Sequence, residues 1–398
     1  MKQIFSLILI FLSFSLYGKE TICLNMIVKD ESAVIRRCLD SVKPYIDYWV
    51  IVDTGSTDGT QEIIKEHMKD IPGELHERPW KNFGYNRTEA LRLAETKADF
   101  LLFVDADDWV EFPKNFTMPP LDQDAYLFQF KYGGATYWKT QLVRSSLSWK
   151  WVGVLHEYLS CNRFHRQTQL EGPQYVFGGD GSSWHDPDKY KRHVQILTEA
   201  LEKDPHNERN VFYLAQSYRD AGDPVQAINY YNKRARMGGW NEEVYWSLFQ
   251  VANLYKALNA SDELISDAYY KALRSRPHRP EPWYYLAELY NNQKKYDLAY
   301  ATLKGHQYIK QPETPDKLFL LDWINKYGFT FQLSMTAYYV GEYEEAIAAC
   351  DEILAMEGLP YWIYECTKKN REFPLAKLSE LALEKNCQKQ GEEKISDA

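Results

Sequence analysis

The second half of this 398-residue chain repeats a short pattern of aliphatic, small and aromatic residues. The clearest copy is Leu214-Ala215-x-x-Tyr218, a spacing that places all three side chains on one side of a helix. Further copies begin at Val251 and Leu286, and a weaker copy, with Ala337 in place of the tyrosine, begins at Leu333. Self-similarity at such a period is typical of arrays of stacked helices. We therefore expect this half of the chain to be helical throughout.

Each copy is followed by a second amphipathic stretch, so the repeated unit is a pair of helices. Small or apolar residues return 12 and 16 positions after the small residue of the first, third and fourth copies. The second copy fits after a one-residue insertion and ends at Pro277. Small residues at a helix crossing, an aromatic residue one turn on and a closing proline resemble the tetratricopeptide repeat. The resemblance implies an all-α tetratricopeptide-like solenoid over residues 188–366, with residues 311–327 inserted between the last two copies.

The same array explains most of the aromatic content, which reaches 15% of the residues. Of the 30 tyrosines, 21 lie between Asp188 and Cys366, mainly where the repeat needs packing between helices. Four aromatic residues lie beside the pattern, and we expect them to line the concave face, where they would stack on sugars or peptides: Trp246, Tyr270, Tyr284 and Tyr285. The repeats are accordingly expected to present an acceptor molecule or to bind a partner protein.

The first half alternates between short apolar runs and stretches with helical spacing. Strands are predicted at residues 21–28, 48–52 and 100–104, and helices at residues 31–43, 60–69 and 84–97. This order predicts an α/β layer built on a parallel sheet. Two further strands, at residues 125–131 and 137–143, are expected to meet at a Gly133-Gly134 turn. We place this α/β domain at residues 20–187.

The two ends of the chain have compositions of their own. Lys2 precedes an apolar run that ends before Gly18, which resembles a signal peptide and is short for a membrane span. A signal-anchor or a buried helix is the alternative for residues 1–18. Localisation stays open: a secretory lumen or the outside if the segment is a signal, otherwise the cytoplasm or a membrane surface. Residues 367–398 are expected to form a capping helix, with disorder from Gln388 on.

Cysteine and charge usage exclude some classes of protein. The six cysteines contain no C-x-x-C pair, so a structural zinc site is not expected. The formal net charge of −9 argues against a nucleic-acid partner, which would require a basic surface. It leaves a nucleotide ligand open, because a metal ion can supply the positive charge.

Three motifs follow the three predicted parallel strands, at the sheet edge where ligands bind in α/β folds. The first, Asp53-Thr-Gly-Ser-Thr-Asp58-Gly, offers an acidic side chain to the N–H and hydroxyl groups of a nucleoside. The second, Asp105-Ala-Asp107-Asp108, concentrates carboxylates that suit Mg²⁺ or Mn²⁺ together with diphosphate oxygens. The third opens the helix before Asp105 and carries Arg87, which is suited to a diphosphate. An ordinary capped turn, a solvated acidic loop and a surface arginine are the alternatives for the three motifs taken singly.

Together with MIVKDE at residues 26–31, the three motifs resemble family 2 glycosyltransferases of the GT-A fold, in a branch with tetratricopeptide repeats. The resemblance implies an α/β GT-A (nucleotide-diphospho-sugar transferase) domain followed by the all-α solenoid. It also implies that Asp53 contacts the nucleoside, that Asp105 lies near the ribose and sugar, and that Asp107 holds the divalent metal. Thr54 and Thr88 depart from the family pattern, which often has Asp and Asn there.

Candidates for the catalytic base and for a further metal ligand lie after the acidic motif in the sequence. An inverting transfer needs a base that takes the acceptor proton, and Gly-Val-Leu-His156-Glu157 lies where the family has one. Glu157 is our candidate base, and His156 is the alternative functional residue. In the following Gly-Gly-Asp180-Gly-Ser-Ser-Trp-His185 segment, His185 is a candidate metal ligand and Asp180 a second candidate base. An alternating strand and a plain linker are the non-functional alternatives for these two segments.

The sequence thus predicts a metal-dependent inverting glycosyltransferase that uses Mn²⁺ or Mg²⁺ and a nucleotide-diphosphate sugar, with a UDP-sugar expected. The acceptor is a carbohydrate, a lipid-linked molecule or a protein. The principal alternative is an inactive GT-A domain on a tetratricopeptide scaffold. A nucleotidyltransferase is a third reading, but it would carry a basic, glycine-rich phosphate loop near the first strand, which this sequence lacks.

Overall fold

The computed structural model describes residues 19–132, 135–181, 186–312, 316 and 318–396, with side chains up to residue 385 other than those of residues 132 and 135. The chain forms two compact units. The first consists of Met1–Phe128, Lys139–Val152 and Glu157–His185, and the second of Gln129–Trp138, Gly153–His156 and Asp186–Ala398. The division lies two residues before our domain boundary at residue 188. Two short segments of the first half also belong to the repeat unit. A single domain boundary along the sequence cannot describe this division.

The α/β unit is built on a sheet with the strand order β3-β2-β1-β4-β7-β6-β10-β5. Its parallel part comprises β1 (Ile22–Val28), β2 (Tyr48–Asp53), β3 (Gly73–Glu77) and β4 (Phe100–Phe103). Three helices connect these strands: α1 (Ile35–Val42), α2 (Thr60–His67) and α3 (Phe83–Ala94). The remaining strands are β5 (Trp109–Glu111), β6 (Ala125–Tyr132), β7 (Ala135–Arg144) and β10 (Gln167–Val176), and β8 (Trp149–Val152) pairs with β9 (Tyr158–Cys161) in a separate hairpin.

The expected strands and helices of this unit are confirmed to within a few residues at each end. Strands β5, β8, β9 and β10 were not predicted, and neither was β3, whose sequence Gly-Glu-Leu-His-Glu is short and polar. Strand β3 forms at the edge of the sheet, where Gly73 lies so close to the ring of Trp49 that no side chain fits between them. The predicted Gly133-Gly134 turn lies outside the described residues.

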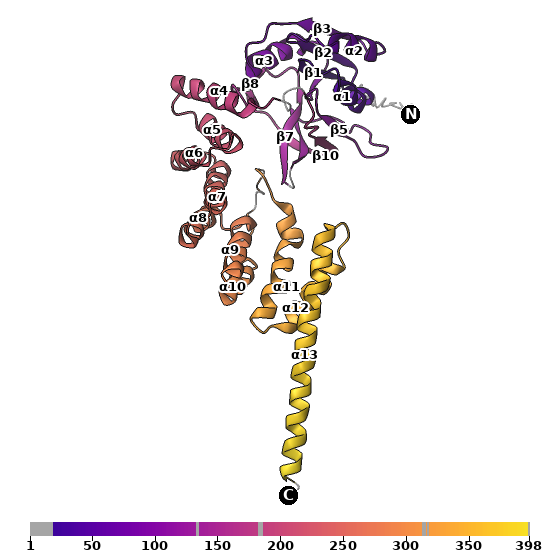
Figure 1. The fold of residues 1–398 in the computed structure, drawn as a ribbon. Coiled ribbons are helices and arrows are strands. Elements are labelled where there is room, and N and C mark those ends of the chain that lie inside the picture. Colours follow the sequence, from indigo (N-terminus) through magenta and orange to yellow (C-terminus); the bar gives the residue numbers. More distant parts are fainter. Residues whose placement is uncertain (1–18, 133–134, 182–185, 313–315, 317, 397–398) are drawn as a thin grey trace, which may run out of the picture. The chain divides into compact units, whose positions relative to one another are not determined.

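The repeat unit consists of helices that pack in consecutive pairs, as Figure 1 shows. They are α4 (Lys189–Lys203), α5 (Glu208–Asp220), α6 (Pro224–Met237), α7 (Asn241–Ala257), α8 (Asp262–Ser275), α9 (Pro280–Asn292), α10 (Tyr296–His306), α11 (Phe329–Tyr339), α12 (Tyr343–Leu354) and α13 (Tyr361–Ser396). The small residue of every copy is buried where its helix meets a neighbour: Ala215, Ala252, Ala287 and Ser334. None of the helices in the described part of the chain combines the length and apolarity of a membrane span.

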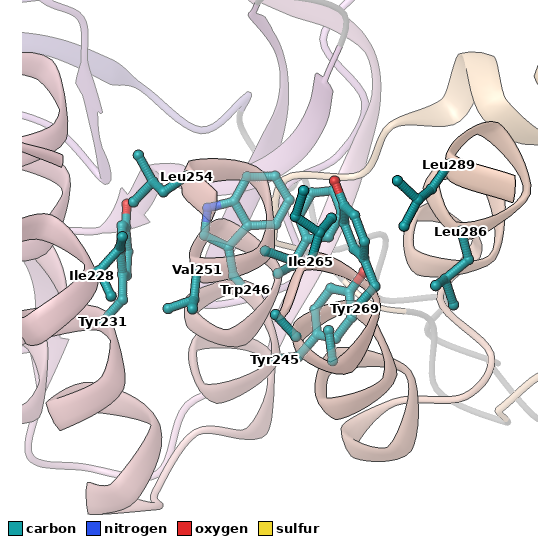
Figure 2. Close-up of a cluster of buried hydrophobic side chains, with 14 of the residues drawn as sticks. Ile228, Tyr231, Tyr245, Trp246, Val251, Leu254, Ile265, Tyr269, Leu286 and Leu289 are labelled. Carbon is teal, nitrogen blue, oxygen red and sulfur yellow. The ribbon is translucent and has the colours of Figure 1, made fainter. Parts of the chain in front are cut away.

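Figure 2 shows how aromatic and aliphatic side chains of successive helices form a continuous core. Tyr231, Tyr245 and Tyr269 are fully buried in it, as expected for repeat packing. Trp246 and Tyr284 are also buried, so the expectation that they line an open face is wrong. Only Tyr270 of that group keeps more than a third of its surface exposed, and its hydroxyl bonds to that of Tyr290.

Two further segments belong to the repeat unit. In the inserted segment, Leu320 forms an antiparallel bridge with Thr136, and Phe319 packs against the rings of Trp246 and Tyr137. At the C-terminus, α13 continues to Ser396, whereas we expected disorder from Gln388 on. Residues 388–396 are rich in Gln, Glu and Lys, which have high intrinsic helix propensities.

Candidate active site

The register of the parallel strands brings the predicted motifs to one edge of the sheet. Val28 at the end of β1 lies opposite Asp53 at the end of β2, and Asn25 of β1 lies opposite Phe103 at the end of β4. The chain therefore leaves β2 at Asp53 and leaves β4 just before Asp105 on the same side. Ligands of open α/β sheets bind at this carboxyl edge.

Asp53 is fully buried, and only one of its two carboxylate oxygens is satisfied. Oδ1 accepts hydrogen bonds from the backbone N–H groups of Gly55 and Ser56, both at 2.8 Å. Oδ2 is buried without a hydrogen-bond partner among the described residues. Because an unpaired buried acceptor costs free energy, such atoms are uncommon and call for a ligand or another explanation. Oδ2 is therefore suited to an N–H or O–H group of a bound nucleoside.

The loop after β1 is tied to the loop after β2 beside Asp53. The Asp30 carboxylate accepts from the backbone N–H of Thr57 at 2.7 Å, and the Ser56 hydroxyl accepts from the N–H of Asp30 at 2.9 Å. Asp58 accepts from Thr60 at the start of α2 and from Ser32. Burial opposes ionisation of Asp58, but these hydrogen bonds lower its pKa to about 2. These hydrogen bonds thus hold the loops after β1 and β2 together beside Asp53.

Arg87 joins two of the other predicted site residues. Its Nη2 lies 2.5 Å from Asp105 Oδ1, and its Nε forms an ion pair of 2.5 Å with Glu157 Oε1. The guanidinium also lies 5.3 Å from the centre of the Trp151 ring. Burial by itself would lower the pKa of Arg87, but the charges of Asp105 and Glu157 raise it above the ordinary value. The structure thus brings Arg87, Asp105 and Glu157 together, although they are far apart in sequence.

Asp108, which we did not single out as a functional residue, organises the acidic loop from within. It is buried and accepts from the backbone N–H of Gly178 at 3.0 Å and from the hydroxyl of Tyr175. The Tyr175 oxygen in turn accepts from the N–H of Asp105 at 2.9 Å. Burial and the nearby charges of Asp105 and Asp107 raise the pKa of Asp108 to about 8. The acid-rich sequence hinted at such crowding, but Tyr175 carries no local signal of this role.

The donor chemistry at Asp105 and Asp107 fits a hard divalent cation. Among the residues that the structure describes, no group of three or more His, Cys, Asp or Glu side chains forms a ready-made metal cage. A nucleotide-binding metal needs only one or two carboxylates, because phosphate oxygens and water fill the remaining positions. Burial is the main cause of the raised pKa of Asp108, and the charges of Asp105 and Asp107 add to it; a cation bound at this loop would offset those charges.

The candidates downstream of the acidic loop have different surroundings. Glu157 is 9% exposed and belongs to the α/β unit beside Arg87. His156 belongs to the repeat unit, where its ring stacks on Tyr213 with centroids 4.0 Å apart and its carbonyl accepts from Arg209 at 2.8 Å. Asp180 forms a two-point ion pair with an arginine of α1. His185 lies outside the described residues, so its predicted ligand role stays a prediction.

The comparison with protein families agrees with the geometry. Residues 23–114 match the model of glycosyl transferase family 2. This family 2 segment contains Asp53, Arg87, Asp105 and Asp107, and it ends before Glu157. The resemblance to family 2 glycosyltransferases that the strand-end motifs indicated is therefore confirmed.

Two curated relatives match the chain over stretches of different length. The SPbeta prophage-derived glycosyltransferase SunS of Bacillus subtilis (strain 168) is 26% identical over 228 residues, which is 54% of this chain and 53% of SunS. The chain thus aligns with about half the length of that relative. A TPR repeat-containing protein of Synechococcus elongatus is 34% identical over 104 residues, a quarter of each chain (25%).

Solved structures similar to this chain include tetratricopeptide repeat proteins. One from Parabacteroides merdae has a TM-score of 0.36 and 18% identity, with coverage of 48% of this chain and 69% of that one. YrrB, described as a TPR protein with an unusual peptide-binding site, has a TM-score of 0.34 and 17% identity, with coverage of 46% and 89%.

Proposed function

We propose that the chain is a metal-dependent, inverting glycosyltransferase whose donor is a nucleotide-diphosphate sugar, with UDP as the nucleotide. The observation that carries the proposal is the buried Oδ2 of Asp53, which has no hydrogen-bond partner among the described residues and lies at the same sheet edge as the Asp105–Asp107 loop. The match of residues 23–114 to glycosyl transferase family 2 supports it.

In this proposal the chain holds the donor from two sides. Asp53 Oδ2 accepts a hydrogen bond from the imide N–H of uracil or from a ribose hydroxyl. This bond supplies the partner that the buried oxygen otherwise lacks among the described residues. Asp105 and Asp107 would hold a divalent cation together with the diphosphate, and the chemistry such a cation would supply is neutralisation of charge on the leaving group. Arg87 keeps Asp105 ionised and oriented, because its guanidinium contacts that carboxylate directly.

The transfer itself is a single in-line displacement. The acceptor oxygen attacks the anomeric carbon, the bond from that carbon to the diphosphate oxygen breaks, and its electron pair leaves with the nucleoside diphosphate. We propose Glu157 as the base that takes the acceptor proton. Arg87 contacts Oε1 of Glu157, so Oε2 is the oxygen assigned to the proton. His156 stays an alternative, although its ring stacks on Tyr213. Asp180 is less suited to the role of base, because both of its carboxylate oxygens already accept hydrogen bonds from Arg37.

The acceptor is a carbohydrate, a lipid-linked molecule or a protein, and we propose that the repeats present it or bind a partner protein. Aromatic residues with substantial exposure lie on the last helices of the array, including Tyr339, Tyr361 and Trp362. These side chains would stack on a peptide or a glycan.

Binding and turnover across a panel of UDP- and GDP-sugars, with and without Mn²⁺, test the proposal. Asp107→Ala is expected to abolish the dependence on Mn²⁺ and most of the turnover. Asp267→Ala, on an exposed part of the repeat unit, is the matched control. Absence of nucleotide-sugar binding by the wild type would favour the alternative, an inactive domain on an interaction scaffold. Equal turnover by wild type and Asp107→Ala would refute the metal site.

A further inference from the structure

Arg37 of α1 connects the loop that contains Asp107 to the neighbouring loop that contains Asp180. Its Nη1 and Nη2 donate to the two carboxylate oxygens of Asp180, each at 2.7 Å, and Nη2 also donates to the backbone carbonyl of Asp107 at 2.6 Å. The guanidinium carbon lies over the ring of Trp109, 4.3 Å from its centroid. One side chain therefore joins the loop after β4 to the loop after β10.

The loop after β10 is pressed against Asp107 on two sides. A Cβ atom at Gly178 would collide with the carbonyl oxygen of Asp107, and one at Gly181 would collide with its carboxylate. The N–H of Gly178 is in turn bonded to Asp108 at 3.0 Å. These glycines allow a backbone approach that a larger residue would prevent, so the position of Asp107 depends on how this loop is held.

We propose that Arg37 is a positioning residue that orients Asp107 for a divalent cation, with Asp180 as the counter-ion that makes this possible. The inference rests on the metal role proposed for Asp107. A planar guanidinium has donors in a fixed fork, so it can fix a carbonyl and a carboxylate at once. An uncompensated positive charge beside Asp107 would repel a cation, and Asp180 neutralises that charge. This role also accounts for Asp180 without assigning it the part of a base.

The decisive variant is Arg37→Lys, which keeps the positive charge and removes the fork. Removing a group that orients a metal ligand weakens metal affinity about 10- to 100-fold. We expect Arg37→Lys to raise the dissociation constant for Mn²⁺ by at least about tenfold, as measured by electron paramagnetic resonance of free Mn²⁺. Turnover at saturating Mn²⁺ is expected to fall much less. Arg36→Lys, at the exposed neighbouring position of the same helix, is the matched control and is expected to bind Mn²⁺ like the wild type.

A second measurement needs no metal. Hydrogen–deuterium exchange of the metal-free protein should speed up in residues 104–110 and 176–181 in Arg37→Lys and in Asp180→Asn, and not in Arg36→Lys. Because both substitutions break the same contact, the double variant Arg37→Lys/Asp180→Asn should weaken Mn²⁺ binding little beyond the more affected single variant.

The outcomes separate this inference from the proposed function. If the wild type binds Mn²⁺ and Arg37→Lys binds it equally well, Arg37 does not position Asp107 and only this inference is overturned, whatever the exchange rates. If the wild type binds no Mn²⁺, the proposed metal site fails, and the inference fails with it.

Discussion

Asp53→Asn is the sharpest test of the nucleoside contact, because the two oxygens of this carboxylate have different surroundings. Oδ1 accepts two backbone N–H groups at 2.8 Å, and an asparagine can keep both of these bonds with its own oxygen. Oδ2 is buried without a partner among the described residues, and the asparagine would put an NH₂ group in its place. The substitution therefore turns an acceptor into a donor at the one atom assigned to the nucleoside.

The expected loss follows from that exchange. A hydrogen bond to a charged group contributes about 1.5–3 kcal/mol, which corresponds to a loss of about 10- to 150-fold in affinity for UDP. The free energy of unfolding should change by less than about 1 kcal/mol, because the internal bonds of Asp53 are kept. Loss of binding without loss of stability would distinguish a ligand contact from a structural one.

Isothermal titration with UDP and thermal unfolding measure the two quantities on the same protein. Asp99→Asn is the matched control: Asp99 accepts the N–H and hydroxyl of Thr21 at 2.9 and 2.8 Å, at the opposite end of the parallel strands. It is expected to reduce stability slightly and to leave UDP affinity unchanged. An Asp53→Asn protein that binds UDP as the wild type does would refute the assignment.

Three further outcomes are expected. Glu157→Gln should abolish sugar transfer and leave UDP affinity within about threefold; normal turnover would remove Glu157 from the role of base. Glu281→Ala should destabilise the repeat unit by about 1–3 kcal/mol in urea unfolding, because it removes the two-point partner of the buried Arg279 guanidinium, which keeps Asp316 as a second counter-ion, whereas Asp267→Ala removes only an exposed pair and should cost little. In the α/β unit, hydrogen bonds from Lys97, His76 and Tyr48 lower the pKa of Glu74 from 4.5 to about 2, with Lys97 contributing most. Burial of the carboxylate acts in the opposite direction and is smaller than the effect of Lys97. Stability from this group is complete above pH 4.5 and is lost as the pH falls toward 2, so wild type and Glu74→Gln should converge in acid, and parallel stability curves would contradict this reasoning.

The strand ends were predictable because each rests on a local pattern. The apolar runs before Asp53 and Asp105 identified buried strands, and the glycines after Asp53 identified a turn. Parallel strands share a carboxyl edge, so the two motifs had to meet. Strand β3 escaped prediction, since a short polar strand at a sheet edge has no distinctive period.

The partners of the site residues were not predictable. Glu157 and Arg87 are separated by seventy positions, and no pattern near either residue indicates that they form an ion pair. His156 and Glu157 are adjacent in the chain, yet the first stacks on Tyr213 and the second contacts Arg87. Adjacency in sequence therefore gave no indication that the two side chains have different surroundings.

The sequence by itself determined the repeat register and the order of strands and helices, because helix crossing and strand burial impose periods that a single chain displays. Ala215 and Ala252, the small residues of two copies, are both fully buried in the core between the helices. Only the tertiary structure decided that Arg37 links Asp180 to Asp107 and that Asp108 becomes a buried acid. Such contacts depend on distances between segments far apart along the chain, and on the desolvation that comes with packing, and neither leaves a local trace in the sequence.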